Sequence, residues 1–371
     1  MNNKKLHIIS FNIPYPPNYG GIIEIFHKIR ILSKLDCEIY LHCFYYGREF
    51  SDELNKYCSK VFYYKRNTSI MANISLKPYI VNSRYSEELI KNLISIDAPI
   101  LFEGLHCTYF INHESLKNRQ LFVRAHNIEH EYYYHLARYE RHLFPKLFFT
   151  IESLRLRFYE NVLKNATILA ITKGDYDYFK NKFDKVEYIG PFHPSDEVII
   201  KDGKGDYILY HGNLSVTENI NAVIFLIKNV FSKITLPVKI AGKNPPVMIE
   251  KLVKKFENIC LIKNPMDSEL TELIRNAQIN VLPTFQNTGI KLKLLAALFN
   301  GRHCLVNKKM IENTMLDELC VVADTPEEFI MNINRLFQQP FENNMILTRK
   351  EILKKFYLND NNAKKLLNLL N

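Results

Sequence analysis

The sequence predicts an α/β protein made of two tandem domains, each with a parallel β-sheet covered by helices. Short β-rich runs alternate with helical stretches in both halves of the chain, which is the pattern of strands and crossover helices in parallel sheets. The alternation stops in a polar segment from about residue 190 to residue 206 and then begins again. With 371 residues, the chain can bury one core in each domain. We therefore expect a ligand site in a cleft between the two domains.

The first half contains a series of candidate strands, most of them separated by helical patterns. A long helical stretch from about residue 129 to residue 164 is expected to break near Pro145, because proline disrupts a helix interior. The candidate strands are Leu6–Ser10, Glu38–Phe44, Lys60–Tyr64, Ile100–Glu103, Gln120–Arg124, Thr167–Ile171 and Val186–Ile189.

The second half repeats this pattern. A helix is expected over Thr217–Phe231, with Ser215 as its N-cap and Glu218 completing a capping box. Residues 349–371 read as a pair of amphipathic helices rich in Lys, Leu and Asn. The candidate strands are Tyr207–Tyr210, Val238–Ala241, Cys260–Ile262, Ile279–Leu282 and His303–Val306.

The composition is that of a soluble globular protein, with 47% hydrophobic and 24% charged residues. We find no apolar run long enough to cross a bilayer and expect no signal peptide. The seven cysteines are scattered singly, which favours reduced thiols in a reducing compartment. These features predict a cytoplasmic protein.

The charge balance is basic. Lys and Arg outnumber Asp and Glu by 49 to 39, a formal net charge of +10. A basic surface favours phosphate-rich partners such as nucleotides, lipid phosphates, an anionic membrane face or nucleic acid. Because the recognisable modules of nucleic-acid binders are absent, we do not expect nucleic acid as a partner.

The loop after the first strand is the first candidate site. It reads Phe11-Asn12-Ile13-Pro14-Tyr15-Pro16-Pro17-Asn18-Tyr19-Gly20-Gly21 and precedes a helix expected to begin near Ile22. Gly20 and Gly21 would let backbone N–H groups approach an anion, such as a diphosphate, at the helix N-terminus. The alternative is an ordinary turn between a strand and a helix.

A second candidate site follows the strand that ends near Arg124. His126, Asn127 and Glu129 come next, where open α/β sheets bind ligands. His126 could donate to a substrate oxygen or move a proton. Alternatively, His126 and Asn127 only cap the next helix, or His126 and His130 bind a metal, although the order His-Glu-x-x-His of zinc proteases is absent. Asp175 and Asp177 fall early in a helix, where capping and solvation are the expected roles.

Two further candidates lie in the second half. Gly212 and Asn213 follow its first strand, and Thr288 and Gly289 stand where a helix is expected to begin near Ile290. Lys291 and Lys293 add positive charge to the first turn of this helix, which the helix dipole disfavours. A bound anion would make these cations tolerable; the alternative is that both lysines are simply solvated.

Together, the four segments resemble the retaining GT-B glycosyltransferases of family 4. The shared features are the Pro-x-x-Gly-Gly type loop, the His126-Asn127-x-Glu129 segment, the glycine-containing strand end at Gly212, and the Thr288-Gly-Ile-Lys-x-Lys-Leu-Leu helix start. The resemblance implies two Rossmann-like domains whose parallel sheets face an interdomain cleft. Residues 1–195 would bind the acceptor, residues 205–345 would bind the nucleotide sugar, and a C-terminal helix of about 349–371 would cross back to the first domain.

The resemblance also implies a reaction and its residues. A sugar would pass, with retention of configuration, from a nucleoside-diphosphate donor to a saccharide or lipid-linked glycan, with no cofactor and no metal required. His126 and Lys291 would be catalytic, and Arg124, Asn127 and Glu129 would bind the acceptor. The donor would be bound by Gly20, Gly21, Gly212, Asn213, Lys243, Thr288, Gly289 and Ile290.

This sequence departs from the family pattern in ways that keep other functions open. Thr288 and Ala296 stand where the family often has two glutamates that contact the donor sugar and the ribose. The usual Arg and Lys of the diphosphate clamp are also absent, and Lys243 or Lys291 would have to replace them. One alternative is therefore a non-catalytic partner subunit with this fold. Another is a sugar-nucleotide epimerase, for which Glu103 and Glu129 are the candidate acid and base.

A segment rich in Tyr, Phe, Leu and Arg, from Tyr132 to Asn165, suggests one more partner. It could rest on an anionic membrane at the inner face and bring the protein to a lipid-linked glycan. The alternative is an amphipathic helix pair that packs on its own domain.

Overall fold

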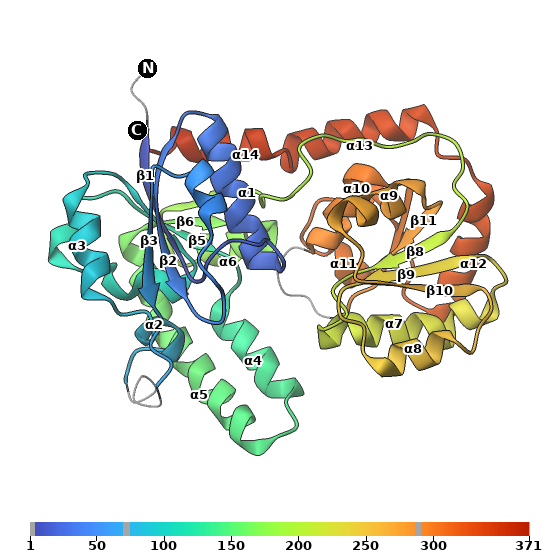
Figure 1. The fold of residues 1–371 in the computed structure, drawn as a ribbon, viewed down its shortest axis with the longest axis horizontal. Helices are drawn as coiled ribbons and strands as arrows, with labels where there is room; N and C mark the ends of the chain where they lie inside the picture. The colour runs from blue at the N-terminus through green and yellow to red at the C-terminus, as the bar shows by residue number, and fades with distance from the viewer. Residues whose placement is uncertain (1–3, 70–74, 286–290, 371) are drawn as a thin grey trace. The chain divides into compact units, whose positions relative to one another are not determined.

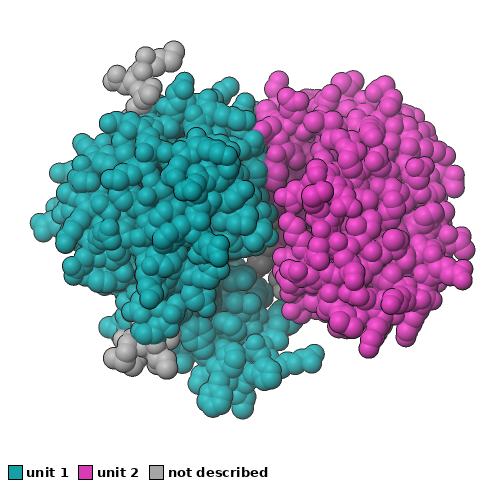
Figure 2. Space-filling view, viewed as in Figure 1, with its two compact units in different colours: residues 1–193, 359–371 teal, residues 194–358 magenta. Residues whose placement is uncertain are grey.

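The computed structural model describes residues 4–69, 75–285 and 291–370, and the chain divides into two compact units. The first unit comprises residues 1–193 and 359–371, and the second comprises residues 194–358 (Figures 1 and 2). Each unit contains one parallel sheet with helices packed on it, so the predicted two-domain α/β class is confirmed.

The sheet of the first unit has the strand order β3-β2-β1-β4-β5-β6-β7, and all its strands are parallel. Near-continuous apolar runs such as Leu6–Ser10 form its centre, because both faces of a parallel sheet are covered. The strands are β1 (Lys5–Ser10), β2 (Glu38–Tyr45), β3 (Lys60–Lys65), β4 (Ile100–Glu103), β5 (Leu121–Ala125), β6 (Thr167–Ala170) and β7 (Val186–Tyr188).

Helices cover both faces of this sheet. Buried residues of α1 and α14 form one core with the sheet, whereas α2, α3, α5 and α6 contribute to the core on the other face (Figure 1). Helices α4 and α5 form an antiparallel pair that projects past the carboxyl ends of the strands (Figure 1). The helices are α1 (Gly20–Lys34), α2 (Tyr79–Asn82), α3 (Glu87–Ser95), α4 (Glu129–Tyr139), α5 (Leu143–Tyr159), α6 (Lys173–Lys180) and α14 (Asn359–Asn368).

The second unit is built in the same way around one core, with the strand order β10-β9-β8-β11-β12-β13. Its strands are β8 (Ile208–His211), β9 (Val238–Gly242), β10 (Ile259–Lys263), β11 (Ile279–Val281), β12 (His303–Val306) and β13 (Val321–Val322). Its helices are α7 (Thr217–Asn229), α8 (Val247–Val253), α9 (Asp267–Asn276), α10 (Leu292–Asn300), α11 (Lys308–Ile311), α12 (Pro326–Gln338) and α13 (Asn343–Phe356).

Both sheets have the strand order of a doubly wound Rossmann-like fold, which reverses direction next to the first strand. The reversal lies between β1 and β4 in the first unit and between β8 and β11 in the second. Open α/β sheets bind ligands at the carboxyl ends of the strands on either side of such a point. The topology therefore places one candidate site at this edge of each sheet.

The structure tests two predictions about helix ends. The predicted capping box is wrong, because Val216 is the N-cap of α7 and the Ser215 hydroxyl donates to Asn213 instead. The prediction that the long helix breaks near Pro145 is confirmed, since α4 ends at Tyr139 and α5 begins at Leu143. Pro145 is the third residue of α5, where its missing N–H needs no helical partner.

Most of the segment expected to be a linker, from residue 194 onward, belongs to the second unit. Ile199 and Gly203 form backbone hydrogen bonds with Phe299 and Phe341 of that unit. At the other end of the chain, α13 belongs to the second unit, and residues 359–371 belong to the first. Among the described residues, no helix is both long enough and apolar enough to span a bilayer.

Candidate functional site

A network of buried charges lies at the carboxyl edge of the first sheet. Glu24 and Lys28 stand one turn apart on α1, and the Lys28 ammonium lies 2.8 Å from Glu24 and 2.6 Å from Glu103. The second Glu103 oxygen lies 2.8 Å from His126 Nε2. Arg124 completes the network with two hydrogen bonds to Glu24, at 2.8 and 3.0 Å. The network thus holds His126 in one orientation, with its side chain 10% exposed.

The carboxylate of Glu24 is stabilised by its cationic neighbours. Burial alone raises the pKa of Glu24, but the charges of Lys28 and Arg124 outweigh this effect and lower the pKa to about 2. Glu24, Glu103 and His126 also offer ligand atoms within 4.8 Å of one another, a spacing that a metal ion could use. The Lys28 ammonium already bonds both carboxylates, so it supplies the positive charge that a cation would bring there. His130, which the alternative metal interpretation paired with His126, lies within hydrogen-bond distance of Glu160.

Arg124 lies behind this site, and the prediction that it binds the acceptor is corrected. It is 1% exposed, and its guanidinium donates to Glu24 and to the carbonyl oxygens of Ile189 and Gly190. This leaves it no surface for an acceptor. Asn127 is half-buried just after β5. The N-cap position of α4 is Ile128, which makes no side-chain capping hydrogen bond, so the alternative that His126 or Asn127 is the N-cap is wrong.

The two glycines before α1 have different surroundings. The space around Gly20 is open, whereas a Cβ atom on Gly21 would lie 2.7 Å from Cζ of Phe11. Gly21 therefore makes room for the Phe11 ring, which lies between the rings of His106 and His126, with centroids 5.2 and 5.7 Å away. This loop thus forms an aromatic wall next to His126.

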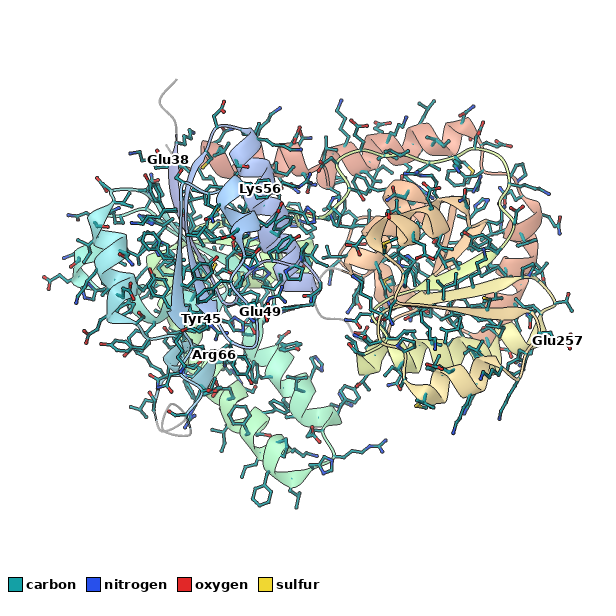
Figure 3. All side chains as sticks on the ribbon, in the orientation of Figure 1. Glu38, Tyr45, Glu49, Lys56, Arg66 and Glu257 are labelled. Carbon is teal, nitrogen blue, oxygen red and sulfur yellow. The ribbon has the colours of Figure 1, made fainter. Side chains whose placement is uncertain are left out.

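Arginines add positive charge to the same edge of the sheet. Tyr45 and Arg66 mark the carboxyl ends of β2 and β3 (Figure 3), and the Arg66 guanidinium lies over the Tyr46 and Tyr79 rings. Arg48 donates to Asn18 and to the Pro16 carbonyl oxygen, which fixes the loop before α1. Such a rim favours a ligand that carries negative charge or many hydroxyl groups.

The second unit has a matching site at the carboxyl ends of β8 and β11. Lys291 is the N-cap of α10, and its ammonium lies 3.5 Å from Glu218 at the start of α7. The Glu218 carboxylate also accepts a hydrogen bond from the Thr284 hydroxyl. Lys293 donates to Asn219 at 2.9 Å and lies over the Tyr210 ring. Because Lys291 contacts Glu218 and Lys293 contacts Asn219 and Tyr210, both lysine side chains lie at the strand ends and do not extend into solvent.

Burial makes Lys293 easy to deprotonate. It lowers the pKa of Lys293 to about 8, although the charge of Glu218 partly opposes this change. Burial also lowers the pKa of His211, at the end of β8, to about 3, and the Lys293 charge adds to the effect. A bound anion would stabilise the charged form of Lys293.

The other residues predicted to bind the donor lie in different surroundings. Gly212 and Asn213 lie at this edge, where Asn213 accepts from Ser215 and its carbonyl oxygen accepts from Asn219. Lys243 is ion-paired with the exposed Asp267 at 3.1 Å. Ala296 packs against the apolar core of the unit. Thr288, Gly289 and Ile290 lie outside the described residues.

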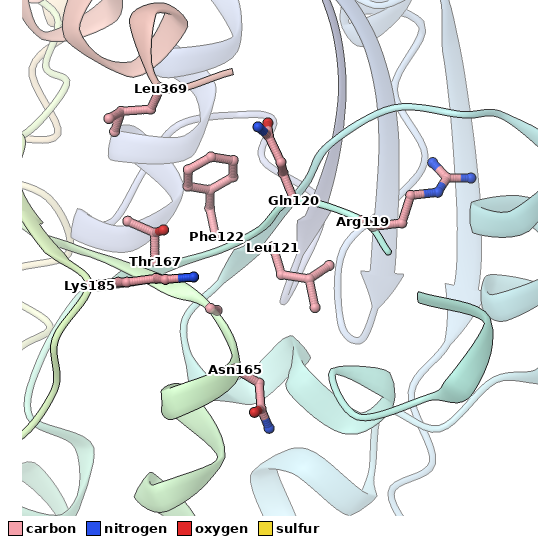
Figure 4. Close-up of a pocket in the computed structure, with 9 residues that line it drawn as sticks. Arg119, Gln120, Leu121, Phe122, Asn165, Thr167, Lys185 and Leu369 are labelled. Atoms are coloured by element: carbon pink, nitrogen blue, oxygen red, sulfur yellow. The ribbon is translucent and has the colours of Figure 1, made fainter. Parts of the chain in front are cut away.

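A pocket of about 320 Å³ lies elsewhere, at the amino ends of β5 and β6 (Figure 4). Its walls include Arg119, Asn165, Lys185 and Leu369 (Figure 4), and they contain none of the residues of the two carboxyl-edge sites. Because parallel sheets place ligands at the opposite, carboxyl edge, we assign no role to this pocket.

Much of the charge network was not predicted from the sequence. Glu24 and Lys28 were not predicted, although a charged pair with helical spacing among Ile22, Ile25 and Ile29 is unusual on a buried helix face. Glu218 was predicted to complete a capping box, and His106 was not predicted as a site residue. These residues gain their significance from contacts with distant segments, which no local pattern reveals.

The fold and the two carboxyl-edge sites define the structural class of this chain: it has the GT-B fold. The TarM structure aligns with a TM-score of 0.67 at 12% sequence identity and covers 99% of both chains. Anabaena HepE, solved with UDP and glucose, aligns with a TM-score of 0.65 at 10% identity over 99% of both chains. WaaG, a glycosyltransferase involved in lipopolysaccharide biosynthesis, gives 0.62 at 11% identity, over 98% of this chain and 99% of its own.

Sequence comparison adds one relative. An uncharacterized 44.6 kDa protein in the cps region of Klebsiella pneumoniae is 27% identical in an alignment 321 positions long, which covers 80% of this chain and 81% of that protein. No family model matches the sequence.

Proposed function

We propose that this protein is a glycosyltransferase that moves a sugar from a nucleoside-diphosphate donor to a saccharide or lipid-linked glycan, with retention of configuration. The observation that carries the proposal is the pair of cations, Lys291 and Lys293, held at the N-terminal end of α10 beside the strand ends of the second sheet. A diphosphate leaving group needs positive charge where its own negative charge develops. Solved GT-B structures support the choice of ligand, since HepE was crystallised with UDP and a S. aureus TarM mutant with UDP and α-GlcNAc-glycerol.

The charges are placed differently from those of the family that the sequence resembles. There, an Arg and a Lys follow the first strand of the second domain and glutamates flank the later helix. Here an acid, Glu218, begins α7, and the lysines begin α10. In this proposal, Lys291 and Lys293 replace the missing clamp and supply the positive charge without a metal. Lys243, paired with Asp267, has a smaller part.

The first unit would bind the acceptor and present His126 to the donor sugar. The Glu103 carboxylate fixes His126 Nε2, which leaves Nδ1 as the ring nitrogen for a substrate. The same contact weakens the case for an epimerase, because both Glu103 oxygens are engaged, with Lys28 and with His126. A non-catalytic partner subunit would require that the second unit does not bind a nucleotide.

A panel of UDP-, GDP-, ADP-, CMP- and dTDP-linked ligands tests the proposal. We expect one of them to raise the thermal unfolding midpoint, because a ligand that binds the folded state stabilises it by mass action. Lys291→Ala should lower the affinity by roughly ten- to hundredfold, since a hydrogen bond to a charged group contributes about 1.5–3 kcal/mol. Lys255→Ala, which removes an exposed lysine at the opposite edge of the second sheet, is the matched control. No shift with any nucleotide at millimolar concentration would favour the partner subunit.

We also propose that the protein acts in the cytoplasm, docked on an anionic membrane through the α4–α5 pair. The apolar residues Leu143, Phe144 and Phe158 of α5 are 81%, 89% and 76% exposed. With Leu147, Ile151 and Leu154, they repeat at helical spacing along one face of the helix. Arg138, Arg141 and Lys146 are exposed at the same tip. An apolar helix face flanked by cations matches the interface of anionic lipids, and a lipid-linked acceptor would lie there.

Co-sedimentation with vesicles tests this docking. We expect the wild-type chain to bind vesicles that contain phosphatidylglycerol, and to bind less at high salt because the lipid charge is screened. Phe144→Glu combined with Leu147→Glu should reduce the bound fraction severalfold. Leu347→Glu, a change at a leucine of α13 that is 66% exposed, should not. Equal binding of all three proteins would refute the proposal, and a change in oligomeric state would assign the face to a second copy.

A further inference from the structure

Two buried polar atoms face each other at the carboxyl edge of the first sheet. Gly104, with a φ of +75°, directly follows β4, and the 3₁₀ helix Leu105–Phe110 that comes next carries His106. Glu129 is the first residue of α4. His106 Nδ1 lies 3.9 Å from Glu129 Oε1, and among the described residues neither atom has a hydrogen-bond partner. Buried polar atoms are rarely left unpaired, so this pair requires an explanation.

The two groups do not form an ion pair at neutral pH. Burial raises the pKa of Glu129 to about 8, although a hydrogen bond from Asn127 and the charge of Arg84 oppose the change. Burial also lowers the pKa of His106 well below its usual range, and the charge of Arg84 adds to the effect. Glu129 therefore carries its proton, and His106 is neutral.

The space between His106 Nδ1 and Glu129 Oε1 suits a ligand group that can both donate and accept a hydrogen bond. A distance of 3.9 Å is too long for a hydrogen bond, but an oxygen atom about 2.8 Å from each of the two atoms would join them. A hydroxyl group suits such a pair, because it can accept from the carboxyl O–H of Glu129 and donate to His106 Nδ1. It would also suit the other imidazole tautomer, since its oxygen can accept two hydrogen bonds.

We propose that His106 and Glu129 form a subsite for one hydroxyl group of a neutral sugar, the acceptor of the transfer proposed above. The identity of the ligand rests on the proposed sugar transfer. The position of the subsite rests on the gap between His106 Nδ1 and Glu129 Oε1. Phe11 supplies an apolar ring beside the gap, 5.2 Å from His106 between ring centroids. Apolar walls with a few placed polar groups are the usual design of small-ligand sites.

The subsite also predicts how binding depends on pH. Because the pKa of Glu129 is about 8, the carboxyl proton is present below that pH and lost above it. Sugar affinity should therefore fall as the pH rises from about 7 to about 9, since the hydrogen-bond donor is lost. The charged and titratable groups that act on the pair are Arg66, Arg84, His126, Tyr133 and Asp175.

Ligand-observed NMR on the full chain tests the proposal, with methyl α-glucoside and methyl β-galactoside as probes. Glu129→Leu and His106→Phe should each weaken the binding of at least one probe by about tenfold. Glu129→Gln keeps a donor at this position, so its affinity should stay within about threefold of wild type and should not depend on pH near 8. Nucleotide-induced thermal shifts, which would report on the donor site proposed for the second unit, should be unchanged in all three variants.

The outcomes separate the two proposals. If the nucleotide shift persists while Glu129→Leu binds both glycosides as well as wild type does, the subsite is refuted and the transferase proposal stands. The same holds if the wild-type chain binds neither glycoside. If no nucleotide shifts the midpoint but the variants lose glycoside binding, the subsite stands and the transferase proposal fails.

Discussion

Lys28→Met should destabilise the first unit by about 3–5 kcal/mol, because it leaves two buried carboxylates without their shared cation. Lys28 and Glu103 are fully buried, and the Glu24 side chain is 4% exposed. Water therefore cannot solvate the two carboxylates once the lysine is removed. Methionine has a similar length and fills the space that the lysine stem occupied. Differential scanning calorimetry of the full chain measures the effect, since two units can unfold in separate transitions.

Two further variants sharpen this experiment. Adding Glu103→Gln to Lys28→Met restores the charge balance of the network and should recover a large part of the lost stability. Lys56→Met removes the lysine of a solvent-exposed ion pair with Glu53 and should have little effect on stability, because water screens that pair. Equal and small effects of Lys28→Met and Lys56→Met would mean that the buried network does not stabilise the fold.

Gly242→Ala should destabilise the second unit by about 2–3 kcal/mol or more and abolish nucleotide binding. Gly242 is the last residue of β9, and a Cβ atom there would overlap the Gly212 carbonyl oxygen and lie 2.7 Å from Leu214 Cγ. The backbone cannot move away freely, because Gly212 N–H donates to Ala241 and Leu214 N–H to Lys243. Overpacking a rigid backbone costs at least as much as overpacking a core.

Thermal unfolding and nucleotide titration check this prediction. The control for stability is Gly20→Ala, since a Cβ atom at Gly20 meets nothing within 4 Å and alanine is the better helix former. Gly20→Ala should therefore leave the midpoint unchanged or raise it. If Gly242→Ala has the stability and nucleotide response of the wild type, the backbone at the end of β9 can shift to accommodate a Cβ atom, and the prediction is wrong.

The sequence by itself determined the strands, their order along the chain and the two-domain α/β class. Apolar runs such as Leu6–Ser10 and Ile279–Leu282 became strands because both faces of a parallel sheet are buried, which makes the runs continuous and easy to read. The sequence also indicated both carboxyl-edge sites, through His126 and Lys291, because polar residues directly after a buried strand must lie at that edge. The two-residue strand β13 was not predicted, since it is too short to leave a pattern.

Only the tertiary structure decided what the polar residues do. Arg124 looked like an acceptor ligand next to His126, but Glu24, a hundred residues earlier in the chain, draws it into the interior. Glu218 was predicted to complete a helix cap, but its carboxylate instead accepts a hydrogen bond from Thr284 and pairs with Lys291. His106 and Glu129 face each other only because β4 and β5 are neighbours in the sheet. The strength of a charge or a hydrogen bond depends on its partner and its burial, and both are set by segments that lie far apart in the sequence.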